Sequence, residues 1–68
     1  MKVKYFPDTD TAHIEFTNLP IEETREISEN IYIDIDQEGN LVSMTIEHAR
    51  ANANLQEFAY QEMAAQEA

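Results

Sequence analysis

Cysteine is absent from this 68-residue sequence, which contains a single glycine and only four lysines and arginines. The lack of cysteine excludes disulfides, thiolate metal sites and cysteine nucleophiles. One glycine cannot form a glycine-rich loop that cradles a phosphate group. No apolar run approaches the roughly 18 residues that span a membrane, and residues 1–5 lack the apolar stretch of a signal peptide. We therefore expect a cytoplasmic protein that has no contact with a membrane and carries no cofactor.

Negative charge dominates the composition. Fourteen acidic residues against four lysines and arginines give a formal net charge of −10. This balance argues against direct binding to DNA or RNA, because contacts with phosphate groups need lysine or arginine. The hydrophobic fraction of 43% is nevertheless that of a folded chain. At this length the sequence predicts one small domain, residues 1–68.

Alternation of apolar and polar residues predicts β-strands over most of the chain. The period of two is clearest at Ile31, Ile33 and Ile35 and is typical of a strand with one buried face. Short turns rich in proline, asparagine and aspartate separate the apolar runs. We expect four or five strands to pair consecutively as an antiparallel meander, with the glutamate-rich third strand at an edge. The expected strands are 2–6, 12–17, 21–27, 31–36 and 42–47, so that the sheet covers about residues 2–47.

A change of period near Ala49 predicts a helix over about residues 50–66. Alanine, glutamine, glutamate, methionine and leucine dominate this segment, and all of them favour helix. Asn54 and Glu57 have the spacing of a capping box, although Asn52 could also begin the helix. The apolar face of the expected helix consists of Leu55, Phe58, Ala59 and Met63. We therefore predict an α+β fold in which this helix packs on the apolar face of the sheet.

The size of the expected core points to self-association. A single helix covers only part of a five-stranded face, and short strands bury little apolar area. At about 25 cal/mol per Å² this burial roughly balances the conformational entropy lost on folding. We therefore predict a homodimer that completes the core, and a structural homodimeric subunit of a larger assembly is one functional alternative.

Acidic residues in the middle of the chain are candidates for binding a basic partner protein. Association driven by an electrostatic field is strong at low salt and weak at high salt. Tyr60, on the opposite side of the expected helix, would add apolar contact area. The alternative is that the charge serves only solubility. The candidate partner-binding carboxylates are Glu22, Glu23, Glu26, Glu29, Asp34 and Asp36.

Two clusters offer a different hypothesis, the binding of a divalent cation or a small ligand. The first cluster consists of Asp8, Asp10, His13 and Glu15, whose carboxylates and imidazole are possible ligands. Cross-strand ion pairs with Lys2 and Lys4 are the simpler interpretation of His13 and Glu15. The second cluster, residues 34–39, begins like a calcium-binding loop, but Thr45 stands at the twelfth position, where such loops need glutamate. A plain hairpin turn is the simpler interpretation of that segment.

Groups that could carry a reaction are not combined in a recognisable arrangement. Ser28 and Ser43 have no partner base at a spacing that indicates a nucleophile. Carboxylates are plentiful, but the polar face of a flat sheet offers no evident pocket that would raise a pKa. We therefore expect a protein without enzymatic activity.

Several short motifs, taken in order, resemble a known family. Members of the family catalogued as domain of unknown function 2283, short bacterial and archaeal proteins, typically begin with M-K-[IV]-x-Y-D-x-x-x-D-x-L-Y-I. They end with V-D-x-D-x-x-G-x-[LV]-V-G-[IL]-E-[IL]. The resemblance covers about residues 1–49. It rests on Met1-Lys2-Val3-Lys4-Tyr5, Asp8 and Asp10, Ala12-His13-Ile14, Arg25-Glu26-Ile27, Ile33-Asp34-Ile35-Asp36, Gly39-Asn40-Leu41-Val42 and Met44-Thr45-Ile46.

The sequence departs from the family pattern at positions that include residues of the expected polar face. Ala12-His13 replaces the usual Leu-Tyr, and Ser43-Met44-Thr45 replaces Gly-Ile-Glu. The resemblance implies a small antiparallel sheet with a C-terminal helix and carries no activity with it. It also implies a partnership with small toxin-like proteins. We therefore expect an acidic adaptor or antitoxin-like protein that covers a basic partner, such as a small nuclease, in the manner of a nucleic-acid mimic.

Overall fold

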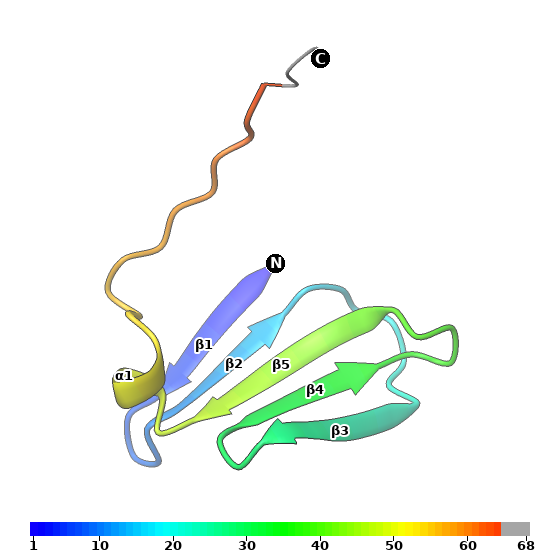
Figure 1. Ribbon diagram of the computed structural model, residues 1–68, viewed down its shortest axis with the longest axis horizontal. Helices are drawn as coiled ribbons and strands as arrows, with labels where there is room; N and C mark the ends of the chain where they lie inside the picture. The colour runs from blue at the N-terminus through cyan, green and yellow to red at the C-terminus, as the bar shows by residue number, and fades with distance from the viewer. Residues whose placement is uncertain (65–68) are drawn as a thin grey trace.

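The computed structural model describes residues 1–64 and shows one open antiparallel sheet followed by a single helical turn (Figure 1). The α+β class and the antiparallel sheet are those predicted from the alternation of residues. The elements are β1 (Lys2–Phe6), β2 (Thr11–Glu15), β3 (Glu23–Ser28), β4 (Ile31–Ile35), β5 (Leu41–Glu47) and α1 (Ala49–Asn52).

The order of the strands in the sheet is β1-β2-β5-β4-β3. The prediction that all strands pair consecutively was therefore wrong at one connection, the one between β2 and β3. Strands β3, β4 and β5 do form a meander, but β2 pairs with β5 and not with β3. The segment between Glu15 and Glu23 carries the chain past the ends of β5 and β4 to the far edge (Figure 1). A central position would have placed the charges of β3 between two strands, whereas an edge leaves them in solvent.

The register of the paired strands places apolar side chains on one face of the sheet and polar side chains on the other. Two rows of aligned residues cross all five strands on each face. The rows of the apolar face are Val3, Ile14, Met44, Ile33 and Arg25, and Tyr5, Ala12, Ile46, Ile31 and Ser28. The rows of the polar face are Lys4, His13, Thr45, Tyr32 and Glu26, and Lys2, Glu15, Ser43, Asp34 and Thr24.

The turn between β4 and β5 is built around the single glycine. Gly39 has a φ of 85°, a left-handed conformation that costs a residue with a Cβ about 1–2 kcal/mol. Asp36 closes the turn, because its backbone N–H donates to the carbonyl of Asn40 over 3.0 Å and its own carbonyl accepts from Gly39 over 3.1 Å. The hairpin predicted from this segment is confirmed.

The C-terminal helix is confirmed, but its predicted extent of about 50–66 was wrong. Helix α1 is one turn, Ala49–Asn52, and residues 53–64 are not helical. Residues 65 and 66 lie outside the described part of the chain. Asn54 and Glu57 are in contact, with 3.0 Å between Nδ2 and Oε2, but this hydrogen bond joins two side chains, whereas a capping box joins side chains to backbone N–H groups. No helix follows these residues within the described part of the chain. An isolated helix of this length is marginal in water without an apolar surface to pack on.

The helical turn packs on the sheet through Ala49 and not through the expected Leu55–Met63 face. Ala49 is fully buried against Ala12 and Ile46, and Leu55 is partly buried beside them. Phe58 and Met63, by contrast, are 67% and 78% exposed. The segment that carries them projects from the corner of the sheet beyond β1 (Figure 1).

Little of the apolar face is covered in the single chain. The buried apolar residues of the described part are Ala12, Ile35, Val42, Ile46 and Ala49. The radius of gyration is 14.1 Å, whereas a compact domain of this length has a value of about 11 Å. The sheet is therefore a single layer whose apolar face lacks a second layer over most of its width.

Candidate protein-binding surface

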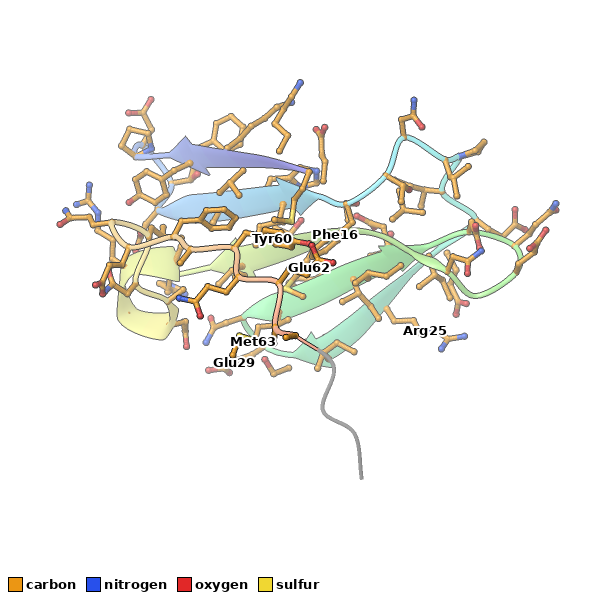
Figure 2. The ribbon with its side chains drawn as sticks, turned by 90° about the horizontal axis from the view of Figure 1, so that it is seen from above. Phe16, Arg25, Glu29, Tyr60, Glu62 and Met63 are labelled. Carbon is orange, nitrogen blue, oxygen red and sulfur yellow. The ribbon has the colours of Figure 1, made fainter. Side chains whose placement is uncertain are left out.

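Strand β3 forms an acidic outer edge of the sheet. Every residue of β3 is exposed, and the strand pairs with β4 on one side only. Glu22 and Glu23 lie at its start, Glu26 in its middle and Glu29 in the turn that follows. Figure 2 shows Arg25 and Glu29 on this side of the molecule, away from β1. The edge position predicted for this segment is confirmed.

One cation lies among these carboxylates. Arg25 donates from Nη2 to Oε2 of Glu23 over 3.1 Å, and both side chains are more than half exposed. The hydrogen bond to Glu23 raises the pKa of Arg25 above its usual value. An exposed pair of this kind contributes little stability. Within residues 1–64 the structure gives the exposed carboxylates of Glu22, Glu26 and Glu29 no ion-pair partner.

Asp34, although a candidate for the same surface, is engaged inside the sheet. Its Oδ2 accepts a hydrogen bond from the hydroxyl of Ser43, and its Oδ1 accepts one from Thr24, both at 2.5 Å. Burial by itself would raise the pKa of Asp34, but these two hydrogen bonds outweigh it and lower the pKa below the usual value. Ser43 is 2% exposed, so Asp34 provides the acceptor that this buried hydroxyl requires.

Asp36 is also occupied by internal hydrogen bonds. The side-chain amide of Asn40 donates to Oδ2 over 3.0 Å, and the backbone N–H groups of Asn40 and Glu38 donate to Oδ1 over 2.8 and 2.9 Å. The hydrogen bonds from Asn40 are the main reason that the pKa of Asp36 is lowered. Residues 34–39, whose spacing resembles the start of a calcium-binding loop, therefore form a hairpin turn. Their two aspartates, Asp34 and Asp36, accept hydrogen bonds from other residues of the chain.

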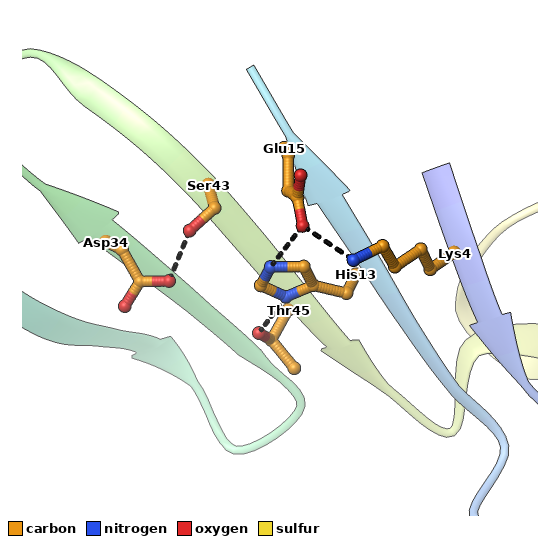
Figure 3. A network of polar contacts seen from close by, with 6 residues as sticks. All are labelled: Lys4, His13, Glu15, Asp34, Ser43 and Thr45. Atoms are coloured by element: carbon orange, nitrogen blue, oxygen red, sulfur yellow. Dashed lines mark hydrogen bonds and ion pairs between the residues drawn. The ribbon is translucent and has the colours of Figure 1, made fainter. Parts of the chain in front are cut away.

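The residues of the other proposed cation site are only partly brought together. His13 and Glu15 lie side by side on the polar face, with 4.0 Å between Nε2 and Oε1 (Figure 3). Lys4 donates to the same oxygen of Glu15 over 3.0 Å, and this hydrogen bond lowers the pKa of the carboxyl. The predicted cross-strand ion pair is thus confirmed. Asp8 is exposed in the β1–β2 turn, and within residues 1–64 no three potential metal ligands are grouped around one point.

Separate hydrogen bonds between side chains join neighbouring strands on the polar face. His13 Nδ1 lies 3.2 Å from the hydroxyl of Thr45 on β5, and Ser43 on the same strand reaches Asp34 on β4 (Figure 3). The burial of Ser43 was not predicted from the sequence. The alternation of Ser43 with Val42 and Met44 correctly predicted that it lies on the polar face. Its burial depends on which strands lie beside β5, and the order of the strands decides that.

Asp10, the remaining predicted ligand, belongs to a small cluster with an aromatic ring and a cation. Its Oδ1 accepts hydrogen bonds from the hydroxyl of Tyr5 over 2.7 Å and from the backbone N–H of Arg50 over 3.2 Å. The guanidinium carbon of Arg50 lies 5.2 Å from the centre of the Tyr5 ring. The backbone of Asp10 has a positive φ of 53°, and its carbonyl oxygen accepts a hydrogen bond from the backbone N–H of Ala49. It therefore fastens the start of α1 to the β1–β2 turn.

This arrangement predicts a change in a measurable pKa. The hydrogen bond from Tyr5 is the largest cause of the lowered pKa of Asp10. We expect Tyr5→Phe to raise the pKa of Asp10 toward its usual value, measured by NMR titration of the side-chain carboxyl carbon. Tyr60→Phe is the control, because Tyr60 is 78% exposed on the C-terminal segment. An unchanged pKa of Asp10 in Tyr5→Phe would show that the hydrogen bond is not formed in solution.

Comparison with known proteins identifies the family. The family model described as "Protein of unknown function (DUF2283)" matches residues 2–50. The chain belongs to this family. The match includes the whole sheet and the beginning of α1, and it leaves the C-terminal segment outside. No curated protein and no solved structure matches the chain significantly. Within residues 1–64, no helix is long and apolar enough to cross a membrane.

Proposed function

We propose that this DUF2283 protein is a non-enzymatic binding module whose acidic β3 edge captures a basic partner protein. The observation that carries the proposal is the exposure of Glu22, Glu23, Glu26 and Glu29 along a strand that has no neighbour on its outer side. Asp34 and Asp36 accept hydrogen bonds from other residues of the chain, so we leave them out of the proposed partner-binding surface. That surface then consists of the four glutamates along the β3 edge.

Two physical features of the edge support this function. The net charge of −10 attracts a cationic surface and speeds its association at low ionic strength. The outer side of an edge strand also leaves backbone N–H and C=O groups free to pair with an extended segment. Carboxylates on such a strand repel another acidic edge, so they select a basic segment and disfavour pairing between two β3 edges. The partner we propose is a small basic protein in the cytoplasm, such as a toxin-like nuclease.

The test compares two charge-matched variants in pull-downs from the lysate of the native host. In the edge variant, Glu22, Glu26 and Glu29 are replaced by glutamine. In the control variant, Asp8, Glu57 and Glu62 are replaced by their amides; these residues are also exposed, and they lie in the β1–β2 turn and on the segment after α1. Both variants lose three negative charges, so only the position of the lost charge differs between them.

We expect the wild-type protein to retain a small basic protein at about 50 mM salt and to release it at about 500 mM, where the Debye length has fallen to a few ångströms. The control variant should retain the same protein and the edge variant should lose it. Equal retention by both variants would contradict a site at β3. Absence of a stoichiometric basic partner at low salt would contradict the proposed function itself.

A further inference from the structure

The segment after α1 and the apolar face of the sheet have complementary properties. Residues 54–64 are exposed except for Leu55, and they include Phe58 and Met63. In the row Val3, Ile14, Met44 and Ile33 on the apolar face, Val3 is 44% exposed and the other three side chains are partly exposed. One chain therefore exposes both an apolar segment and an apolar surface that fits it.

We infer that a second copy of this chain covers the apolar face, with its residues 54–63 folded as a helix across the row Val3, Ile14, Met44 and Ile33. The arrangement is reciprocal, so that two copies related by a twofold axis exchange their C-terminal segments and form a closed dimer. This interface lies on the face of the sheet and is separate from the β3 edge, so the inference does not depend on the proposed function.

The local structure of the segment favours a helix once an apolar surface is available. Leu55, Phe58, Ala59 and Met63 fall on one side of a helix. The side chains of Asn54 and Glu57 are already in contact, and the backbone N–H of Gln56 donates to Oδ1 of Asn54 over 3.3 Å. The hydrogen bond from Gln56 is that of a helix N-cap residue, and it reduces the cost of the first turn, which is the unfavourable step of helix formation.

The length of a helix over residues 54–63 matches the distance from β1 to β4 across the sheet. Ten helical residues, 54–63, extend over about 15 Å at 1.5 Å per residue. The distance from β1 to β4 across β2 and β5 is three strand spacings, or about 14 Å at 4.8 Å each. A helix formed by the segment would therefore cover the open row from Val3 to Ile33.

The path of the segment points to another copy as the source of this helix. In its own chain the segment contacts the β1 side of the face, where Leu55 and Phe58 line a groove of about 540 Å³ with Met1, Val3 and Ile14. Leu55 also packs against the cluster formed by Ala12, Ile46 and Ala49. Beyond this groove the segment runs past the N-terminal end of β1 (Figure 1).

Charge is also complementary between the face and the segment. Both arginines of the chain border the apolar face, Arg25 at the end of the row and Arg50 beside Tyr5. The segment carries the carboxylates Glu57 and Glu62. Ion pairs between the arginines of one copy and the glutamates of the other would reduce the repulsion between two copies that each have a net charge of −10.

Sedimentation equilibrium of the full chain tests this inference. We expect a mass of twice 7.8 kDa for the wild type at about 100 µM, a concentration at which a micromolar dimer is formed. Phe58→Asp should raise the dissociation constant roughly 100-fold, because it places a charge in the centre of the interface. Gln61→Asp adds the same charge on the opposite side of the expected helix and should leave the dimer intact. A monomeric wild type, or equal dissociation of the two variants, would overturn the inference.

A second measurement identifies the contact surface. In a mixture of isotope-labelled and unlabelled chains, intermolecular NOEs should connect the Phe58 ring of one copy with methyl groups of Ile14, Met44 and Ile33 in the other. A dimer whose NOEs connect these groups only within one chain would show that the segment folds back on its own sheet. That result would overturn the exchange of segments while leaving the β3 proposal unaffected.

Discussion

Replacing Ile46 by alanine is expected to lower the free energy of unfolding by about 2–5 kcal/mol, the range for truncation of a buried isoleucine. Ile46 is 9% exposed and lies on β5, the strand between β2 and β4, where it is aligned with Ala12 and Ile31. It also contacts the Ala12–Ala49 cluster that holds α1. A 68-residue domain has a total stability of roughly 3–10 kcal/mol, so this loss is a large part of it.

Urea denaturation followed by circular dichroism, at one fixed protein concentration, measures this effect. Ile21→Ala is the matched control, because Ile21 lies outside the strands and is 54% exposed. We expect the control to lose less than about 1 kcal/mol. Similar losses in both variants would mean that β5 does not form the centre of the folded sheet.

Removal of the Asp34 carboxylate is expected to give the second largest effect. Asp34→Ala leaves the hydroxyl of Ser43 buried without its acceptor, which costs about 1–3 kcal/mol. Adding Ser43→Ala to this variant removes the unsatisfied hydroxyl as well, so the double variant should recover part of the loss. Asp8→Ala, a change at an exposed aspartate, should alter stability by no more than about 0.5 kcal/mol.

The same residue gives the stability a dependence on pH. Because hydrogen bonds lower the pKa of Asp34 in the folded state, its carboxylate stabilises the fold fully above the unfolded pKa, near pH 4, and this contribution is lost as the pH falls through the folded pKa. The difference in unfolding free energy between the wild type and Asp34→Asn should therefore shrink as the pH is lowered below about 4. A difference that stays constant down to pH 2 would contradict the hydrogen-bonded carboxylate.

Local sequence patterns predicted most of the sheet. A strand with one apolar face needs only the alternation seen at Ile31, Ile33 and Ile35, and short turns permit only antiparallel neighbours. The glutamates of β3 predicted an edge, because charge on both sides of a central strand would be desolvated. These properties depend on residues that are close in the chain, so the sequence shows them directly.

The candidate surface was predicted less completely, because carboxylates that look alike in the sequence have different neighbours in the fold. Asp34 faces Ser43 across β4 and β5, and Asp36 faces Asn40 across a turn, whereas Glu26 and Glu29 face solvent. No spacing along the chain distinguishes these cases. The pairing of strands decides which acids are available to a partner.

The sequence by itself determined the strands, their turns, the acidic edge and the strong negative charge, since each depends on local preference or on composition. The tertiary structure alone decided that β2 pairs with β5, because pairing of distant strands follows from burial of the whole sheet and not from any one segment. It also limited the C-terminal helix to Ala49–Asn52. A short amphipathic segment is helical only where an apolar surface covers its face, and within one chain Leu55 and Phe58 line an apolar groove whereas Met63 is 78% exposed.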